Sequence, residues 1–141
     1  MIIQQLSIFL ENRVGGINDA ISVLSNHNIN MRAFCVADGV DFGILRVIVS
    51  DVDAAVKVLQ EANFRVAKTD VICLDVPNTA GALSRVLKCL AQEDVFIEYM
   101  YAFSEGDVAS TVIRPTDIKC CAEILEKNRE LLLSSSPLYQ F

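Results

Sequence analysis

The sequence of 141 residues contains one histidine, three prolines, six glycines and no tryptophan. No hydrophobic run approaches the length of about 18 residues that a membrane-spanning helix needs, and the first residues lack a basic segment followed by an apolar one. We therefore expect no membrane span and no secretory signal peptide. No segment rich in glycine, serine and proline divides the chain, so its parts are expected to be closely coupled.

The cysteines, charges and motifs exclude several other classes of protein. The five cysteines are odd in number and form no CxxC motif, which predicts reduced thiols in a cytoplasmic protein. No group of cysteines and histidines has metal-ligand spacing, and neither a P-loop nor a GxGxxG motif is present, so we expect no metal and no cofactor. A net charge of −6 argues against nucleic acid as a partner.

Residues that commonly perform catalysis are scarce. The single histidine, His27, stands between two asparagines at a predicted helix end, where a surface or capping role is the usual one. The neighbouring thiols of Cys120 and Cys121 lie on a predicted helix, so their side chains point in different directions. Because no nucleophile is paired with a base, we predict no catalytic residues and no enzyme activity.

The sequence is repeated. Shifted by 66 positions, it aligns with itself without a gap, and the class of residue matches at most apolar positions although identities are few. Such a repeat predicts one folding unit used twice. Units of about 65–70 residues bury only about 60% of their unfolded surface, so we expect the halves to pack on each other or on a second chain. Aligned pairs are Asn12 with Asn78, Gly15 with Gly81, Leu24 with Leu90, Asp51 with Asp117, and Leu59 with Leu125.

Each repeat predicts the order β-α-β-β-α-β. Alternating apolar residues predict the strands, apolar residues at helical spacing predict the helices, and Asp51 and Asp117 occupy N-cap positions. In the first repeat we expect strands at 5–10, 30–37, 42–49 and 64–67, with helices over 17–24 and after Asp51. In the second we expect strands at 71–76, 96–103, 108–113 and 131–133, with helices over 83–90 and after Asp117, and a loop at 134–137.

This order predicts an α+β fold made of two ferredoxin-like repeats, each with an antiparallel sheet and both helices on one face. We place the domains at residues 1–68 and 69–141. We expect them to join side by side into one eight-stranded sheet.

A polar turn that ends in glycine precedes the first helix of each repeat. The N–H groups at a helix N-terminus attract anions, and glycine lets a ligand approach the backbone. An asparagine amide both donates and accepts hydrogen bonds, which suits the carboxylate and ammonium groups of an amino acid. A purely structural turn, capped by asparagine, fits the same residues, so both interpretations stay open at this point. The turns are Asn12-Arg13-Val14-Gly15 and Asn78-Thr79-Ala80-Gly81.

The first turn, with the segment Ile29-Asn30-Met31 after the helix, resembles the signature of the ACT domain. That signature is a D/N-x-P-G-x-L turn followed by an x-N-I strand start. The likeness is strong to the regulatory domains of phosphoglycerate dehydrogenases, in which Glu-Asn-Arg-Pro-Gly fills the turn and two asparagines hold the effector amino acid. Those two asparagines correspond to Asn12 and Asn30. The resemblance covers both repeats and rests on the motif, the element order and the duplication together.

The resemblance implies that an amino acid binds where the turn of one domain meets a neighbouring domain. It also implies pairing of domains through their second strands, a homodimer, and a partner enzyme that is regulated. Val14 and Ala80 replace the usual proline, and Phe96 stands where the first repeat has Asn30, so a second equivalent site is in doubt. The candidate ligand-binding residues are Asn12, Arg13, Val14, Gly15, Gly16, Asn30, Met31, Asn78, Thr79, Ala80, Gly81, Phe96 and Ile97.

We therefore expect a stand-alone regulatory protein that binds an amino acid at an inter-domain crevice. Asn12 and Asn30 would make polar contacts, and the backbone amides around Gly15 would hold the carboxylate. The main alternative is an oligomerisation module whose ligand site has decayed. A small enzyme on a ferredoxin-like scaffold lacks a recognisable base, and an RNA-binding sheet is disfavoured by the acidic composition.

Overall fold

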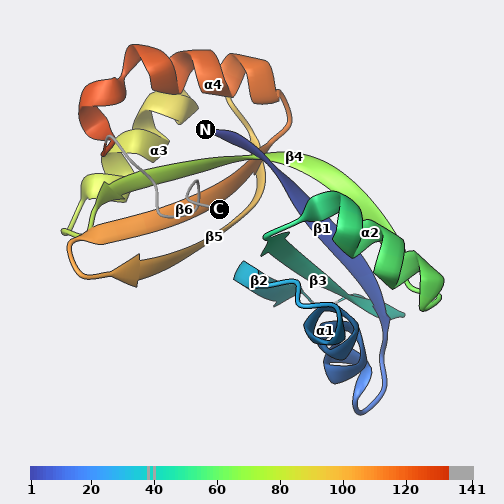
Figure 1. The fold of residues 1–141 in the computed structure, drawn as a ribbon. Coiled ribbons are helices and arrows are strands. Elements are labelled where there is room, and N and C mark those ends of the chain that lie inside the picture. Colours follow the sequence, from blue (N-terminus) through green and yellow to red (C-terminus); the bar gives the residue numbers. More distant parts are fainter. Residues whose placement is uncertain (38, 40, 134–141) are drawn as a thin grey trace. The chain divides into compact units, whose positions relative to one another are not determined.

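A computed structural model describes residues 1–37, 39 and 41–133, and the chain divides into two compact units. The first-repeat unit comprises Gln4–Thr69. The second-repeat unit comprises Met1–Ile3 together with the chain from Asp70 onward. In each unit two helices lie on one face of antiparallel strands (Figure 1).

The backbone repeats as closely as the sequence does. Three pairs of elements, α1 with α3, β3 with β6, and α2 with α4, begin and end at positions 66 residues apart. The first-repeat unit contains most of β1 (Ile2–Glu11), α1 (Gly16–Asn26), β2 (Met31–Ala37), β3 (Phe42–Val49), α2 (Val52–Glu61) and the start of β4 (Arg65–Pro77). The second-repeat unit contains the rest of β4, α3 (Ala82–Gln92), β5 (Ile97–Glu105), β6 (Val108–Pro115), α4 (Ile118–Lys127) and a 3₁₀ helix, η1 (Arg129–Leu131).

The strands form a six-stranded sheet in the order β2-β3-β1-β4-β6-β5, so the α+β class is confirmed but eight strands are not found among the described residues. Two expected strands, at 64–67 and 71–76, are one continuous strand, β4, because no glycine or proline interrupts the chain between them. The strand expected at 131–133 is replaced by η1, in which the N–H groups of Leu131 and Leu132 donate to carbonyls three residues earlier. The loop expected at 134–137 lies outside the described residues.

The second strands of the two repeats, β2 and β5, end this strand order at opposite sides. Among the described residues β2 pairs with β3 alone, and β5 pairs with β6 alone.

Each unit has its own core between its strands and its helices. In the first-repeat unit Leu6 and Ile8 of β1 meet Leu24 of α1 and Leu59 of α2, and all four are completely buried. In the second-repeat unit the equivalent positions include Ile72, Leu90 and Leu125. Each such side chain contributes about 1.5–3 kcal/mol through its burial, so the apolar stripes read from the sequence are core positions.

Both predicted N-caps are confirmed. The Asp51 carboxylate accepts a hydrogen bond from the N–H of Ala54 at 3.0 Å, and the Asp117 carboxylate accepts one from the N–H of Cys120 at 2.9 Å.

We expect Asp51→Ala to lower the free energy of unfolding by about 1 kcal/mol, measured by urea denaturation, because one helix N–H loses its partner. Asp51→Asn keeps an acceptor and is the control. An equal loss in both variants would contradict the capping role.

A thiol in the second core makes stability depend on alkaline pH. Burial raises the pKa of Cys121 from 9.0 to about 11. Above pH 9 the unfolded chain releases this proton while the folded chain keeps it, so folding stability falls as the pH rises from about 9 to 11. We expect urea denaturation at pH 8 to 11 to show a steeper loss of stability for the wild type than for Cys121→Ala. Parallel curves would contradict the assignment.

Candidate ligand-binding site

The β1–α1 turn of the first repeat is fixed by its two glycines. Gly15, the N-cap of α1, has φ +85°, a left-handed conformation that costs other residues about 1–2 kcal/mol. Gly16 packs against the end of β1, where an added Cβ would lie 2.9 Å from the carbonyl oxygen of Glu11. The N–H of Gly16 also donates to the carbonyl of Arg13 at 3.2 Å. Glycine is therefore required here by the turn itself, whatever else the turn binds.

The β4–α3 turn of the second repeat has the same backbone. Gly81 has φ +85°, and the N–H of Ala82 donates to the carbonyl of Thr79 at 3.2 Å. Neither α1 nor α3 has a side chain that caps its N-terminus. The first N–H groups of an α-helix have no intrahelical partner, so both turns present donors to an anion.

The asparagines of the two turns are both exposed. The amide nitrogen of Asn78 donates to the carbonyl of Gly106 at 3.0 Å, and its backbone N–H donates to the carbonyl of Asp107 at 2.8 Å. These bonds fasten the turn to the β5–β6 hairpin, which is a structural role. Asn12 is exposed, and its side-chain oxygen lies 3.7 Å from the position that a Cβ on Gly43 would occupy.

The charge of Arg13 is neutralised within the turn. Its guanidinium group forms ion pairs with Glu11 at 3.3 Å and with Asp19 at 2.5 Å. The hydrogen bond that the Arg13 guanidinium donates to Asp19 raises the pKa of Arg13. Because both carboxylates compete with any bound anion, Arg13 is better suited to holding the turn than to holding a ligand carboxylate. Val14, beside it, is fully exposed.

Asn30 and Met31 lie at the opposite end of α1 from Asn12. A helix of 11 residues is about 16 Å long, so one repeat does not bring the two asparagines together. The backbone N–H of Asn30 donates to the hydroxyl of Ser50 at 3.0 Å. The side chain of Asn30 is exposed.

The second repeat separates its candidate residues in the same way. Phe96 and Ile97 follow α3, whereas Asn78, Thr79, Ala80 and Gly81 precede it. Phe96 keeps one backbone contact of Asn30: its carbonyl accepts from the N–H of Thr116 at 3.0 Å, as the carbonyl of Asn30 accepts from the N–H of Ser50 at 2.9 Å. Its ring, however, is 67% exposed.

Two cavities of the first-repeat unit contain predicted site residues. The first, of about 510 Å³, includes Arg13 and Gly16 of the turn. The second, of about 450 Å³, includes Asn30 and Met31. The expected site is thus divided between two cavities.

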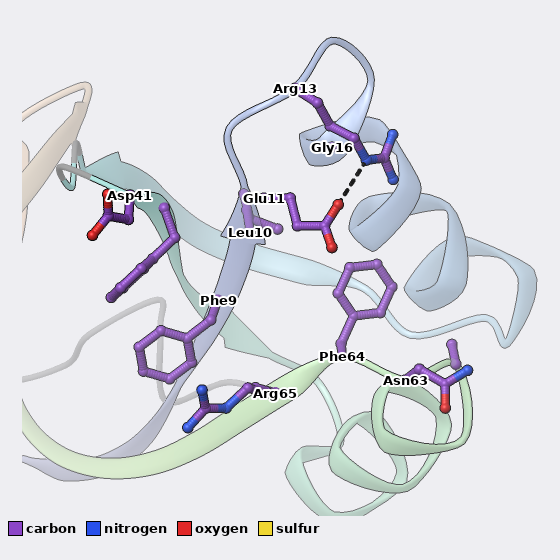
Figure 2. A pocket seen from close by; sticks show the side chains of 11 residues that line it. Phe9, Leu10, Glu11, Arg13, Gly16, Asp41, Asn63, Phe64 and Arg65 are labelled. Carbon is purple, nitrogen blue, oxygen red and sulfur yellow. Dashed lines mark hydrogen bonds and ion pairs between the residues drawn. The ribbon is translucent and has the colours of Figure 1, made fainter.

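The larger cavity surrounds the end of β1 (Figure 2). Glu11 lies between a group on one side of the strand, which contains Phe9, Arg65 and Asp41, and a group on the other, which contains Phe64 and Asn63. Sequence reasoning missed the aromatic residues and Arg65. A comparison of the two repeats would have identified them, because the second repeat has none of these side chains at the matching positions.

Within residues 1–37, 39 and 41–133, no three His, Cys, Asp or Glu side chains are grouped to hold a metal ion. None of the helices in these ranges has the length and apolar character needed to cross a membrane.

Comparison with known proteins places these observations in a family. The model of the ACT domain pair matches residues 1–138. The crystal structure of protein BT0572 from Bacteroides thetaiotaomicron is 48% identical and has a TM-score of 0.92, covering 100% of this chain and 98% of that one. None of the curated proteins matches the chain.

Two more distant structures share the fold. The ligand-free regulatory subunit of aspartate kinase from Thermus thermophilus is 10% identical with a TM-score of 0.64, covering 90% of this chain and 94% of that one. Aspartokinase III of E. coli, in complex with lysine and aspartate, is 14% identical with a TM-score of 0.56, covering 94% of this chain and 32% of that one. The repeated helices and strands, the paired glycine turns and the family match agree, and the chain belongs to the ACT domain pair family.

Proposed function

We propose that this protein is a cytoplasmic regulatory module that binds an amino acid at the β1–α1 turn of its first repeat and so controls a partner enzyme. The observation that carries the proposal is the turn itself: an α-helix whose N-terminus has no side-chain cap, entered through Gly15 with Asn12 exposed beside it. Donors at such a terminus favour a carboxylate. No catalytic group accompanies the turn, so the module acts by binding.

The relatives support a regulatory role without naming the ligand. One of the distant structures is a regulatory subunit of aspartate kinase, and another is an aspartokinase in complex with lysine and aspartate. Folds host many functions, so this likeness supports the class of role rather than a particular amino acid or enzyme.

We further propose that the site is completed by a second copy of the chain. Asn12 and Asn30 lie at opposite ends of α1, so they can share one ligand only if they come from different domains. The free edge of β2 supplies a surface for a second copy, because unpaired strand edges pair readily with another chain. On that strand the apolar side chains of Phe34 and Val36 are both exposed.

Two variants test whether two copies share the site. We expect Asn12→Ala and Asn30→Ala each to lose amino-acid binding in calorimetry while the helical circular dichroism stays unchanged. A mixed dimer, made by co-expression with two affinity tags, should regain half of the sites, since one of its two interfaces keeps both asparagines. Loss of binding in the mixed dimer would place both residues in one domain, and unchanged affinity in the single variants would overturn the site.

A thermal-shift screen against the twenty amino acids tests the ligand class. An amino acid at about 100 times its dissociation constant adds about 2.7 kcal/mol to stability, which raises the melting temperature by about 5–10 °C for a chain of this size. We expect one or two amino acids to respond, and Asn12→Ala to abolish the response. A flat result for all twenty would favour the alternative, an oligomerisation module whose turn is only structural.

A further inference from the structure

The larger cavity of the first-repeat unit contains Arg65 and three phenylalanines that are not part of the proposed amino-acid site. We propose that this cavity is a second binding site, which takes a small carboxylate bearing an aromatic or other flat apolar group. The cavity lies within one unit and includes neither Asn12 nor Asn30. It shares Arg13 and Gly16 with the turn proposed above, whereas Arg65, Asp41 and the three rings lie outside that turn.

The apolar part of the site consists of rings that do not belong to the core. The rings of Phe9 and Phe42 meet edge to face, with centroids 5.5 Å apart at 63°. Neither residue is part of the core cluster of this unit, and Phe42 is 42% exposed. Phe64 differs, because it packs against that core and closes the cavity on the helix side. Exposed rings at a cavity offer a flat ligand offset or edge-to-face stacking.

Arg65 supplies the anchor for the carboxylate. Its guanidinium lies over the ring of Phe9, 5.8 Å from the centroid, and the side chain is exposed. Among the described residues no carboxylate lies within ion-pair distance of Arg65, in contrast to Arg13, which has two. A guanidinium group binds a carboxylate through two parallel hydrogen bonds, and the ring beneath it holds the donors in place.

The second repeat serves as an internal control. Its backbone follows that of the first, with matching bounds for α1 and α3, β3 and β6, and α2 and α4. At the positions of Phe9 and Phe42, where both repeats have strands, the fold therefore does not require aromatic rings. The positions of Phe64 and Arg65 fall in η1 in the second repeat, so the comparison applies to the two rings alone. A role beyond folding accounts for why only the first repeat carries these two rings. The replacements in the second repeat are Asp75 for Phe9, Val108 for Phe42, Glu130 for Phe64 and Leu131 for Arg65.

The size and charge of the cavity define its ligand class. A volume of about 510 Å³ lies within the range of about 300–1,000 Å³ found for small-molecule sites. Asp41, at the rim on the same side of β1 as Arg65, can accept a hydrogen bond from an ammonium group. An aromatic amino acid and its counterpart without the amino group share the ring and the carboxylate, and both fit.

Four probes separate these features in calorimetry with the full chain. Phenylalanine has the ring, the carboxylate and the ammonium group, 3-phenylpropionate lacks the ammonium group, and phenethylamine lacks the carboxylate. Propionate lacks the ring. We expect 3-phenylpropionate or phenylalanine, or both, to bind, and phenethylamine and propionate not to bind. If phenylalanine binds more tightly than 3-phenylpropionate, and Asp41→Asn removes that difference, the ligand is an amino acid. If 3-phenylpropionate binds as tightly as phenylalanine or more tightly, the ligand is an acid without the amino group.

Variants of Arg65 test the anchor. We expect Arg65→Gln to weaken binding of the carboxylate probes at least about tenfold, and Arg65→Lys to restore part of the loss. The matched control is Arg85→Gln, an exposed arginine of the second repeat, which should leave binding unchanged. Asn12→Ala should also leave it unchanged, which distinguishes binding in this cavity from binding that depends on Asn12.

Three results would overturn the proposal. They are binding of phenethylamine as tight as that of 3-phenylpropionate, full affinity in Arg65→Gln, or no binding of either ring-bearing carboxylate. Unfolding curves of each variant show whether a loss of binding reflects a loss of fold. Phe42→Leu, which keeps an apolar side chain but removes a ring, provides a second test. It should weaken the binding of 3-phenylpropionate without abolishing it.

Discussion

The passage from strand to helix through a left-handed glycine is the constraint on which each repeat depends. Gly15 and Gly81 share a φ of +85°, and each serves as the N-cap of its helix. This turn reverses the chain so that the apolar stripe of the helix meets the apolar face of the sheet. Any other residue in place of Gly15 would add the energetic cost of a left-handed backbone. The turn cannot shift to relieve this cost, because Gly16 already lies against the end of β1.

The two repeats use one backbone for different chemistry. The turn asparagines Asn12 and Asn78 are both exposed, and Asn78 donates from its amide to the carbonyl of Gly106 in the β5–β6 hairpin. The position of Asp19, which pairs with Arg13, is taken by Arg85 in the second repeat. A duplicated fold thus separates what folding requires, which both copies keep, from what differs between them. The features of the first copy alone are the better guide to its ligands.

The elements predicted from local patterns were mostly confirmed, and the departures have local causes. The amphipathic stripes and the aspartate caps depend on residues within one or two turns of each other, so periodicity locates them. The merging of two expected strands into β4 was not predictable from alternation alone, because a short polar stretch such as Lys68-Thr69-Asp70 fits either a turn or a continuous strand. Met1–Ile3 belong to the second-repeat unit because they pair with residues some seventy positions away. For example, the N–H of Cys73 donates to the carbonyl of Met1.

The sequence by itself determined the duplication, the element order up to the last strand of the second repeat, the core stripes and the turn glycines, because each depends on the spacing of neighbouring residues. Only the tertiary structure decided which of the candidate residues meet. In the structure Asn12 and Asn30 lie at the two ends of α1, and Arg13 forms ion pairs with two carboxylates. Arg65 of β4 lies over the ring of Phe9 of β1. Contacts between residues distant in the chain depend on how the strands pair and how helices cross them, and residue spacing does not encode that geometry.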